Sequence, residues 1–432
     1  MSSPTLPSRT PMLARWAAVT TLTTLLASCG GGGGSAGAPL EPTAVVISTQ
    51  PANQAVVSGQ SASFSVVATG NGSLSYQWRL NGADVAGANA VNFTPQALET
   101  TQDNAQVSVR VSDIGGSRVS NAATLRVYSP TNLPAPTVTD FEANATEAVI
   151  DAAFGAHIAT SNSILTPKGR LFVFLPASLS VPSRTQLVLN AAANNGLHAI
   201  GLAYPNDVVL DSACSGASDA ACWGNAREEI RSGSNVSANV AVNEANAIEH
   251  RLLKALQYLV QTQPTRGWEQ YLDNGTAVRW DRVRIAGHSQ GGGHAAYIAT
   301  KRPLDRACLF SSPADYDDVR QQPAAWLSAT SATPASKLYG FSHQRDMVVG
   351  INKLQSIWSA LGMAAFGGLT LIDDVPLSAY QGRHMLYTDR PVVGGISGQS
   401  YHGAPVVDLL TPIDSVSGLP AYWPIWQYAC FL

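Results

Sequence analysis

The residues of this 432-residue chain that are best suited to chemistry surround one serine. Ser289 is the centre of the GxSxG sequence Gly287-His288-Ser289-Gln290-Gly291. A serine hydroxyl is a poor nucleophile at neutral pH, so it needs an imidazole to accept its proton and a carboxylate to orient that imidazole. The chain after Ser289 offers the imidazoles of His384 and His402 and the carboxylates of Asp346, Asp373 and Asp374. This combination predicts nucleophilic catalysis by Ser289.

The serine stands where a strand is predicted to turn into a helix. Arg282–Ala286 reads as a buried strand, and Gly292–Thr300 has the pattern of a helix. GxSxG at such a junction forces the serine into a tight, strained turn, which only small neighbouring residues permit. The same turn places the backbone N–H of Gln290 at the start of a helix, where it can donate to a developing oxyanion.

Strands and helices alternate from about residue 138 to the C-terminus. The strand-like runs include Leu171–Leu175 and His198–Ala203, and helices are expected over Thr185–Asn195 and Ala238–Gln263. In the second helix, apolar residues fall on one stripe that should face a sheet. The alternation predicts an α/β domain over residues 138–432 with a mostly parallel sheet covered on both faces.

The GHSQG turn in this setting resembles the nucleophile elbow of the α/β-hydrolase superfamily of serine hydrolases, and the resemblance extends over residues 140–432. Superfamily members order the nucleophile, the acid and the base along the chain. The resemblance therefore implies Asp346, which follows the strand-like run Lys337–Phe341, as the acid. It implies His402, in a loop rich in glycine and serine, as the base. His384 is the alternative base, and Asp373 and Asp374 are the alternative acids.

A second oxyanion donor is expected in the loop after Leu171–Leu175. The superfamily often has a glycine there, whereas this chain has Ala177 and Ser178, either of which offers a backbone N–H. The resemblance implies cleavage of a carboxylic ester through an acyl-enzyme, without a cofactor. No cysteine or histidine cluster has zinc spacing, so no metal is expected.

Other polar residues of this region are interpreted as structural. His288 and His294 are expected to pack or to form hydrogen bonds. Arg227, Glu228 and Glu229 are interpreted as an ion-pair cluster, since adjacent carboxylates seldom reach one sugar as glycoside hydrolysis requires.

An all-β domain is predicted over residues 43–128. Short alternating runs separated by turn signals cover residues 62–68, 74–80, 106–111 and 123–128. The sequences Tyr76–Ala88, with Trp78, and Asp103–Gly115 resemble strands of bacterial immunoglobulin-like domains. Where that family often has bridging cysteines and a corner tyrosine, this chain has Phe64, Val109 and Val107, so apolar packing must substitute for the disulfide. Trp78 is interpreted as a core anchor, the domain as a spacer, and residues 129–137 as a proline-rich linker.

The first 28 residues have the features of an export signal. Arg9 and Arg15 precede an apolar run, Trp16–Leu26, that is too short to span a bilayer. Leu26-Ala27-Ser28-Cys29 resembles the bacterial lipobox, which would make Cys29 the lipidated first residue of the mature chain. A glycine-rich tether, residues 29–42, follows. These features predict an extracytoplasmic lipoprotein anchored to a bacterial membrane.

Cysteine usage agrees with export. If Cys29 carries lipid, four of the five cysteines remain, an even number for an oxidising compartment. Cys214 and Cys222 bracket a loop of small polar residues, which predicts a local disulfide. A second bond between Cys308 and Cys430 is left open, because Cys308 could equally be a small buried apolar residue.

Composition narrows the function. Charged residues are 13% of the chain and the net charge is -3, so no basic face exists for nucleic acid. The sequence thus favours an exported serine hydrolase acting on a small or polymeric ester, with lipase, polyester depolymerase and peptidase as related alternatives. A surface binding or adhesion lipoprotein with an inactive hydrolase scaffold is the alternative of a different class. No oligomeric state is indicated.

Overall fold

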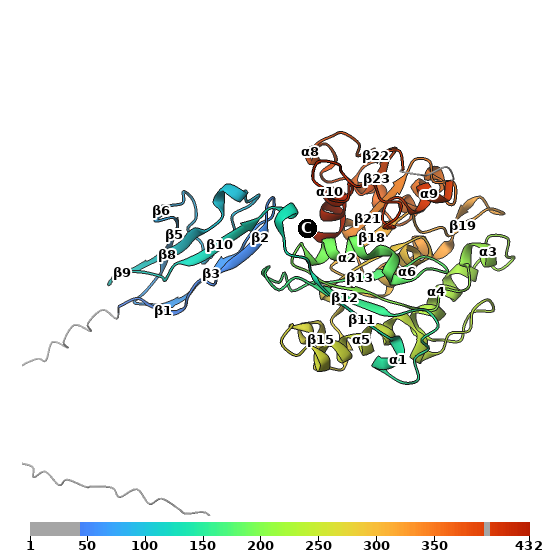
Figure 1. Cartoon of the computed structure of the whole chain (residues 1–432), viewed down its shortest axis with the longest axis horizontal. Helices are drawn as coiled ribbons and strands as arrows, with labels where there is room; N and C mark the ends of the chain where they lie inside the picture. Colours follow the sequence, from blue (N-terminus) through green and yellow to red (C-terminus); the bar gives the residue numbers. More distant parts are fainter. Residues whose placement is uncertain (1–43, 393–397) are drawn as a thin grey trace, which may run out of the picture. The chain divides into compact units, whose positions relative to one another are not determined.

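The computed structural model describes residues 44–392 and 398–432. The predicted export signal, Cys29 and the whole of the predicted tether lie outside the described residues. The described chain forms an all-β domain followed by an α/β domain, and Figure 1 labels many of their elements. No helix of the described ranges combines the length and the apolar character needed to cross a membrane.

The all-β domain is built from short strands around one apolar core. Its largest sheet has the order β2-β10-β8-β5-β6, with β9 paired to β8, and two small pairs, β1-β4 and β3-β7, complete the domain. The strands are β1 (Val46–Thr49), β2 (Gln54–Val57), β3 (Phe64–Ser65), β4 (Val67–Thr69), β5 (Ser75–Leu80), β6 (Ala83–Asp84), β7 (Asn92–Phe93), β8 (Ala105–Asp113), β9 (Gly116–Val119) and β10 (Ala123–Tyr128).

Trp78 is the centre of that core. Its side chain is fully buried, stacks on Phe93 at 5.7 Å between ring centroids, and donates from Nε1 to the Ala90 carbonyl at 2.9 Å. Phe64 and Val109, together with Val107, are also buried in this core. The prediction that Trp78 is a core anchor in a domain closed by apolar packing is therefore confirmed.

The α/β domain is organised by a nine-stranded, mostly parallel sheet with the order β11-β12-β14-β13-β17-β18-β21-β23-β22. β11 and β12, and β12 and β14, pair antiparallel, whereas every later pair is parallel. The strands are β11 (Thr137–Phe141), β12 (His157–Ser161), β13 (Leu171–Leu175), β14 (His198–Gly201), β17 (Val283–His288), β18 (Arg306–Phe310), β21 (Leu338–His343), β22 (Thr370–Leu371) and β23 (Met385–Thr388). Small two-stranded pairs are β15 (Leu272–Asp273) with β16 (Ala277–Val278), and β19 (Tyr316–Asp317) with β20 (Gln322–Pro323).

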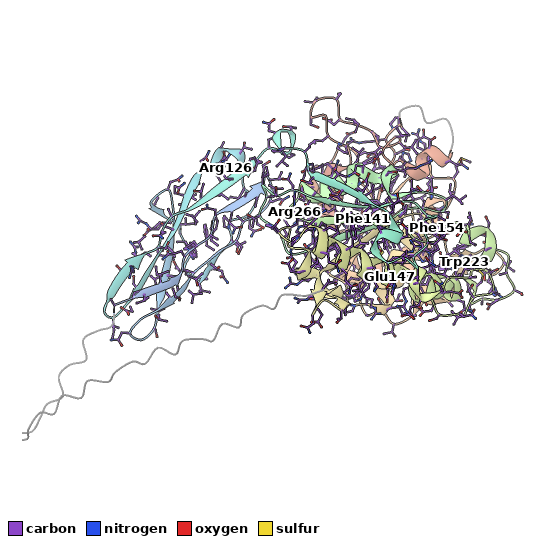
Figure 2. The ribbon with its side chains drawn as sticks, turned by 60° about the horizontal axis from the view of Figure 1, so that its bottom comes forward. Arg126, Phe141, Glu147, Phe154, Trp223 and Arg266 are labelled. Atoms are coloured by element: carbon purple, nitrogen blue, oxygen red, sulfur yellow. A yellow bond between two sulfur atoms is a disulfide. The ribbon has the colours of Figure 1, made fainter. Side chains whose placement is uncertain are left out.

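Both faces of this sheet are buried, as the continuous apolar strands predict. In β13, Leu171, Val173 and Leu175 join the core beneath α4, α5, α6 and α7, while Phe172 and Phe174 join the opposite core beneath α2 and α10. The helices are α1 (Ala143–Thr146), α2 (Gln186–Ala193), α3 (Leu210–Cys214), α4 (Cys222–Ser232), α5 (Ile248–Thr262), α6 (Gln290–Lys301), α7 (Ile351–Ala360), α8 (Leu377–Tyr380), α9 (Gly398–Gly403) and α10 (Trp423–Trp426). Figure 2 labels Phe141 and Glu147, which contact Tyr258 and Lys254 of α5.

One predicted element was wrong in its extent. The helix expected over Ala238–Gln263 begins only at Ile248. The residues before it are held in an irregular path because the buried carboxylate of Glu229 accepts the backbone N–H groups of Val236, Ser237 and Val242. From Ile248 onward the expected apolar stripe is buried against the sheet.

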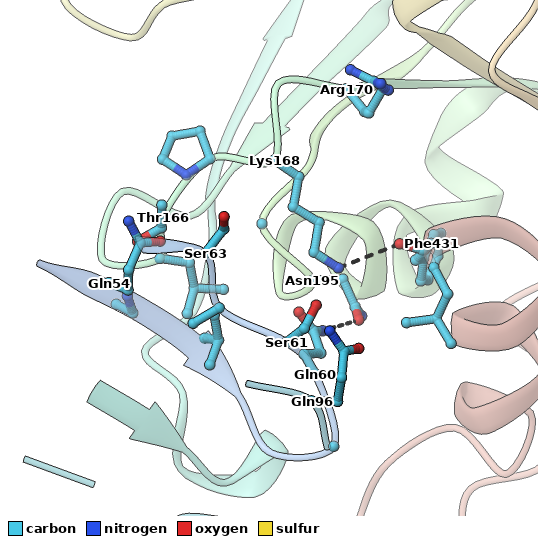
Figure 3. Close-up of a pocket in the computed structure, with 18 of the residues that line it drawn as sticks. Gln54, Gln60, Ser61, Ser63, Gln96, Thr166, Lys168, Arg170, Asn195 and Phe431 are labelled. Atoms are coloured by element: carbon cyan, nitrogen blue, oxygen red, sulfur yellow. Dashed lines mark hydrogen bonds between the residues drawn. The ribbon is translucent and has the colours of Figure 1, made fainter. Parts of the chain in front are cut away.

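The C-terminal segment closes the α2 face of the sheet. Arg284 and Arg306, at the amino ends of β17 and β18, donate to backbone carbonyls of residues 428–430. Lys168 donates from Nζ to the Phe431 carbonyl at 3.4 Å (Figure 3). Burial and the charge of Arg284 lower the pKa of Lys168 to about 7.

Candidate active site

The GHSQG sequence forms a strained turn at the carboxyl end of β17. Ser289 has φ 54° and ψ -120°, which L-residues rarely adopt, and α6 begins at the next residue, Gln290. Such backbone conformations cost on the order of 1–3 kcal/mol and persist where the surrounding structure enforces them. Here the close approach of other chain segments enforces the turn. A Cβ on Gly291 would overlap the carbonyl oxygens of Leu175 and Pro176.

The structure brings His402 and Asp346 into direct contact. His402 Nδ1 donates to Asp346 Oδ2 at 2.8 Å, and both side chains are buried. His402 Nε2 has no hydrogen-bond partner among the described residues. Because a carboxylate can only accept, the proton of a neutral His402 lies on Nδ1 and the lone pair lies on Nε2.

Further hydrogen bonds fix the Asp346 carboxylate. The backbone N–H groups of Val348 and Val349 donate to Asp346 Oδ1, and Ser342 Oγ lies 3.4 Å from Oδ2. Burial opposes ionisation of Asp346, but the hydrogen bond and charge of His402 and the two N–H groups outweigh it and lower its pKa. Asp346 is therefore ionised at neutral pH and can hold the imidazole in one tautomer.

His288 connects the turn to His402. Its Nε2 donates to the backbone carbonyl of His402 at 3.0 Å, and the two rings lie 4.8 Å apart. Burial lowers the pKa of His288 to about 3, so the ring stays neutral. The sequence expectation that His402 lies in a loop was wrong, since His402 belongs to the short helix α9. Because Ser289 follows His288 directly, the His288 bond holds α9 beside the serine. The expected structural role of His288 is thus found.

The loop after β13 presents two unpaired backbone donors. The N–H groups of Ala177 and Ser178 make no hydrogen bond within the described residues. The loop is rigid, because Asn206 donates from Nδ2 to the Ala177 and Ser180 carbonyls, both at 2.8 Å. Leu179, at φ 55°, donates to the Asn206 carbonyl.

Gln290 ties this loop to the helix. Its Oε1 accepts from Ser178 Oγ at 2.9 Å and from the Leu210 N–H at 3.0 Å. Its own N–H is the first of α6 and has no acceptor in the helix. Donors from Gln290 and from the Ala177–Ser178 loop are therefore held at one place on the sheet edge.

A buried ion pair supports the helix from below. Arg227 pairs with Asp315 and donates from Nη1 to the Gln290 carbonyl at 3.2 Å. Trp326 donates to the same carboxylate at 2.8 Å. A Cβ on Gly293 would overlap the Arg227 guanidinium, which explains why glycines continue beyond the GxSxG sequence.

The predicted cluster of Arg227, Glu228 and Glu229 was wrong, since the three residues have separate partners. Glu228 pairs with Arg231, Glu229 binds backbone N–H groups, and Arg227 pairs with Asp315, 88 positions later in the chain. A partner so distant leaves no pattern in the sequence, so neither Asp315 nor Asn206 could be identified from it. His294 is fully buried and lies edge-on to Tyr204, as a packing residue does.

The alternative base lies elsewhere. His384 stacks on Tyr339 and Phe366 and bonds from Nδ1 to the Leu338 carbonyl at 2.8 Å. Leu338 begins β21, whereas Asp346 follows the other end of that strand. The structure therefore places His384 at the amino edge of the sheet, away from Ser289.

The alternative acids are also not brought to His402. Asp373 accepts from Thr388 Oγ1 and from the Asp389 N–H, both at 2.6 Å, and so shapes the loop after β23. Asp374 is largely exposed and pairs with Arg390.

Both cysteine pairs are bonded. The predicted Cys214–Cys222 disulfide is confirmed, and Cys308 is bonded to Cys430, which settles the pairing that the sequence left open. Among the described residues there is no group of three or more histidine, cysteine or acidic side chains that could hold a metal ion.

No family model and no curated protein matches this chain. Among similar solved structures, the tandem Ig repeats of Dlar are 18% identical over 20% of this chain and 49% of theirs, with a TM-score of 0.19. The N-terminal Ig1-2 module of the Drosophila receptor protein tyrosine phosphatase DLAR is 18% identical over 31% of this chain and 61% of that module, with a TM-score of 0.20. Titin domain M7 is 22% identical over 21% of this chain and 99% of the domain, with a TM-score of 0.19. The chain thus spans about half of the first of these structures.

Proposed function

We propose that this protein is a serine hydrolase of the α/β-hydrolase type that cleaves carboxylic esters. The observation that carries the proposal is the His402–Asp346 pair. Its imidazole has Nδ1 bound to a buried carboxylate and Nε2 without a partner in the described structure, and its backbone carbonyl in α9 is tied to the residue before a strained Ser289.

In the proposed reaction, His402 Nε2 accepts the Ser289 hydroxyl proton while Oγ attacks the ester carbonyl carbon. The carbonyl π electrons move to oxygen, where N–H groups of Gln290 and of Ala177 or Ser178 stabilise the negative charge. Collapse breaks the bond to the alcohol, which takes the proton from His402. Water then gives a proton to the same imidazole while its oxygen attacks the acyl carbon. The bond from this carbon to Ser289 Oγ breaks, Oγ takes the proton back from His402, and the acid is released.

An apolar ester is favoured over a charged one. Leu179, next to the proposed oxyanion donors, and Met347, next to the proposed acid, are 70% and 80% exposed. Exposed apolar side chains on both loops would contact an apolar acyl chain or a polyester surface. A lipase or a polyester depolymerase would use the same chemistry.

The rest of the proposal concerns location. The lipobox-like sequence at Cys29 supports lipid anchoring at a bacterial membrane, and the two disulfides fit an oxidising, extracytoplasmic compartment. The all-β domain would then act as an immunoglobulin-like spacer between the anchor and the hydrolase.

Hydrolysis of p-nitrophenyl butyrate, compared with butyryl p-nitroanilide, tests the proposal. The wild-type protein should hydrolyse the ester, and Ser289→Ala should lose this activity. Ser356→Ala, an exposed serine of α7, is the matched control and should retain it. Wild-type protein without esterase activity would contradict the proposal and favour a surface binding protein with an inactive scaffold.

A further inference from the structure

A cavity lies within the α/β domain, apart from the proposed catalytic residues. It has a volume of about 510 Å³, and its lining residues do not include Ser289, Asp346 or His402. One wall is the segment after β14, residues 205–208, and the opposite wall is formed by residues 238–242. This volume suits a small organic ligand, because ligand sites in proteins are usually clefts of about 300–1,000 Å³.

Both walls are held in place without a ligand. The buried Glu229 carboxylate accepts three backbone N–H groups from residues 236–242 and so fixes one wall. In the other wall, Asn206 points away from the cavity lining and binds two carbonyls of the loop after β13. A pre-formed cavity loses little conformational entropy on binding, which favours a real binding site.

The lining combines an aromatic ring and aliphatic side chains with unused hydrogen-bond acceptors. Phe154, labelled in Figure 2, lines the cavity together with Val208, Ile230 and Val240. Within the described residues, the Asp207 carboxylate has no hydrogen-bond partner, and Asp151 uses Oδ1 to accept the Ala153 N–H while Oδ2 accepts none. Asn239 donates from Nδ2 to Cys222 Sγ at 3.1 Å, which leaves its Oδ1 free.

This chemistry selects among ligands. Carboxylates at the rim disfavour an anion. The Arg251 guanidinium lies over one face of the Phe154 ring at 5.4 Å and donates to the Asp151 carbonyl at 2.8 Å, so its positive charge disfavours a cation on the other face of that ring. A neutral ligand with several hydroxyl donors and an apolar C–H face matches both the acceptors and the ring.

We propose that this cavity binds a carbohydrate, with the C–H face of a sugar ring on Phe154 and its hydroxyls donating to Asp151, Asp207 and Asn239. The site does not depend on the proposed hydrolase activity. Asn206, within the wall of residues 205–208, binds the loop after β13. A sugar bound in the cavity would therefore lie at the same carboxyl edge of the sheet as Ser289.

Binding is tested with the full-length protein carrying Ser289→Ala, so that no probe is turned over. The probes are cellobiose, xylobiose and N,N′-diacetylchitobiose, measured by saturation-transfer NMR and calorimetry, with 1,4-diaminobutane as a cationic probe. At least one disaccharide should bind. Phe154→Ala should weaken that binding at least tenfold and Asp207→Asn several-fold, whereas Asp140→Asn, an exposed aspartate of β11, should leave it unchanged.

Two results would overturn the proposal. The first is that none of the three disaccharides binds at about 20 mM, a concentration chosen because isolated sugar sites are weak; binding of the diamine would not change this conclusion. The second is disaccharide binding that Phe154→Ala and Asp207→Asn leave unaltered. Phe154→Leu keeps the apolar volume and serves if Phe154→Ala does not fold, since it should also lose the aromatic contribution. Ester hydrolysis by Phe154→Leu in the otherwise wild-type protein is measured separately, so failure of the sugar site and failure of the hydrolase are distinguishable.

Discussion

Similar residues have different hydrogen-bonding environments at the carboxyl and amino edges of the nine-stranded sheet. At the carboxyl edge, His402 has a free Nε2, the N–H groups of Ala177 and Ser178 make no hydrogen bond in the described chain, and Ser289 is strained. At the amino edge, His384 is stacked between two rings and bonded to a carbonyl. Residue type alone therefore does not identify a site. What distinguishes the two edges is hydrogen-bonding capacity that is held rigidly and left unused.

The difference between the two edges is tested most directly by replacing each of the two histidines with glutamine. His402→Gln should lower kcat for p-nitrophenyl butyrate by at least about 10³-fold, because removing a triad base typically costs that much or more. His384→Gln removes a packed ring far from the proposed nucleophile, so it should reduce stability and leave kcat within about threefold. Equal losses of kcat in two folded variants would show that the edges do not differ as described.

The two disulfides should contribute different amounts to the free energy of unfolding. Cys308–Cys430 joins the sheet to the C-terminal segment across 122 positions, whereas Cys214–Cys222 closes a separation of 8 between α3 and α4. In the chain-entropy model, loops of these lengths contribute about 5 and about 2.5 kcal/mol, respectively. Urea unfolding of the two double Cys→Ala variants should therefore show the larger loss for the pair 308/430. The reverse order would indicate that the C-terminal segment is not essential to the α2 face.

The buried ion pair between Arg227 and Asp315, which contacts the start of α6, should contribute to stability as buried pairs do. Arg227→Met leaves Asp315 charged and buried, so the free energy of unfolding should fall by about 3–5 kcal/mol. Lys353→Met removes an exposed ion pair with Asp318 and should cost about 0–1 kcal/mol. Similar values for both substitutions, measured by urea unfolding, would contradict the support that Arg227 is inferred to give Gln290.

A further expected effect concerns the pH dependence of stability at the amino edge. The pKa of Lys168 is lowered to about 7 in the folded protein, while an unfolded lysine titrates near 10.4. Between these values the unfolded state binds more protons, so the free energy of unfolding should rise from pH 7 toward pH 10. Lys168→Met should remove that part of the rise. Parallel stability profiles of the two proteins over this range would show that Lys168 is not desolvated.

Local patterns predicted the parts of the fold that local forces determine. The continuous apolar run Leu171–Leu175 is β13 with the same bounds, and the strand, turn and helix around Ser289 were anticipated from the glycine spacing. The antiparallel strands β11 and β12 were not anticipated. β11 is a short edge strand that directly continues the proline-rich linker, whereas β12 is buried between β11 and β14 through pairings that local sequence does not reveal. The start of α5 was misplaced because Glu229 captures the preceding residues through a contact remote in sequence.

The candidate site shows the same division. The types and order of Ser289, Asp346 and His402 could be read from the sequence with the help of a family resemblance. The choice between His384 and His402 could not, because it depends on which end of β21 each histidine reaches. Asn206, Arg227 and Asp315 became visible only when the chain was folded, since their partners are distant along it.

The central claim is that Ser289 is a nucleophile activated by His402. Its most direct test is labelling of the intact protein with a fluorophosphonate, followed by peptide mapping by mass spectrometry. The account predicts one adduct, on Ser289, in the wild-type protein, and none in folded Ser289→Ala or His402→Gln protein. An unlabelled wild-type protein, or a label carried by another residue, would contradict it.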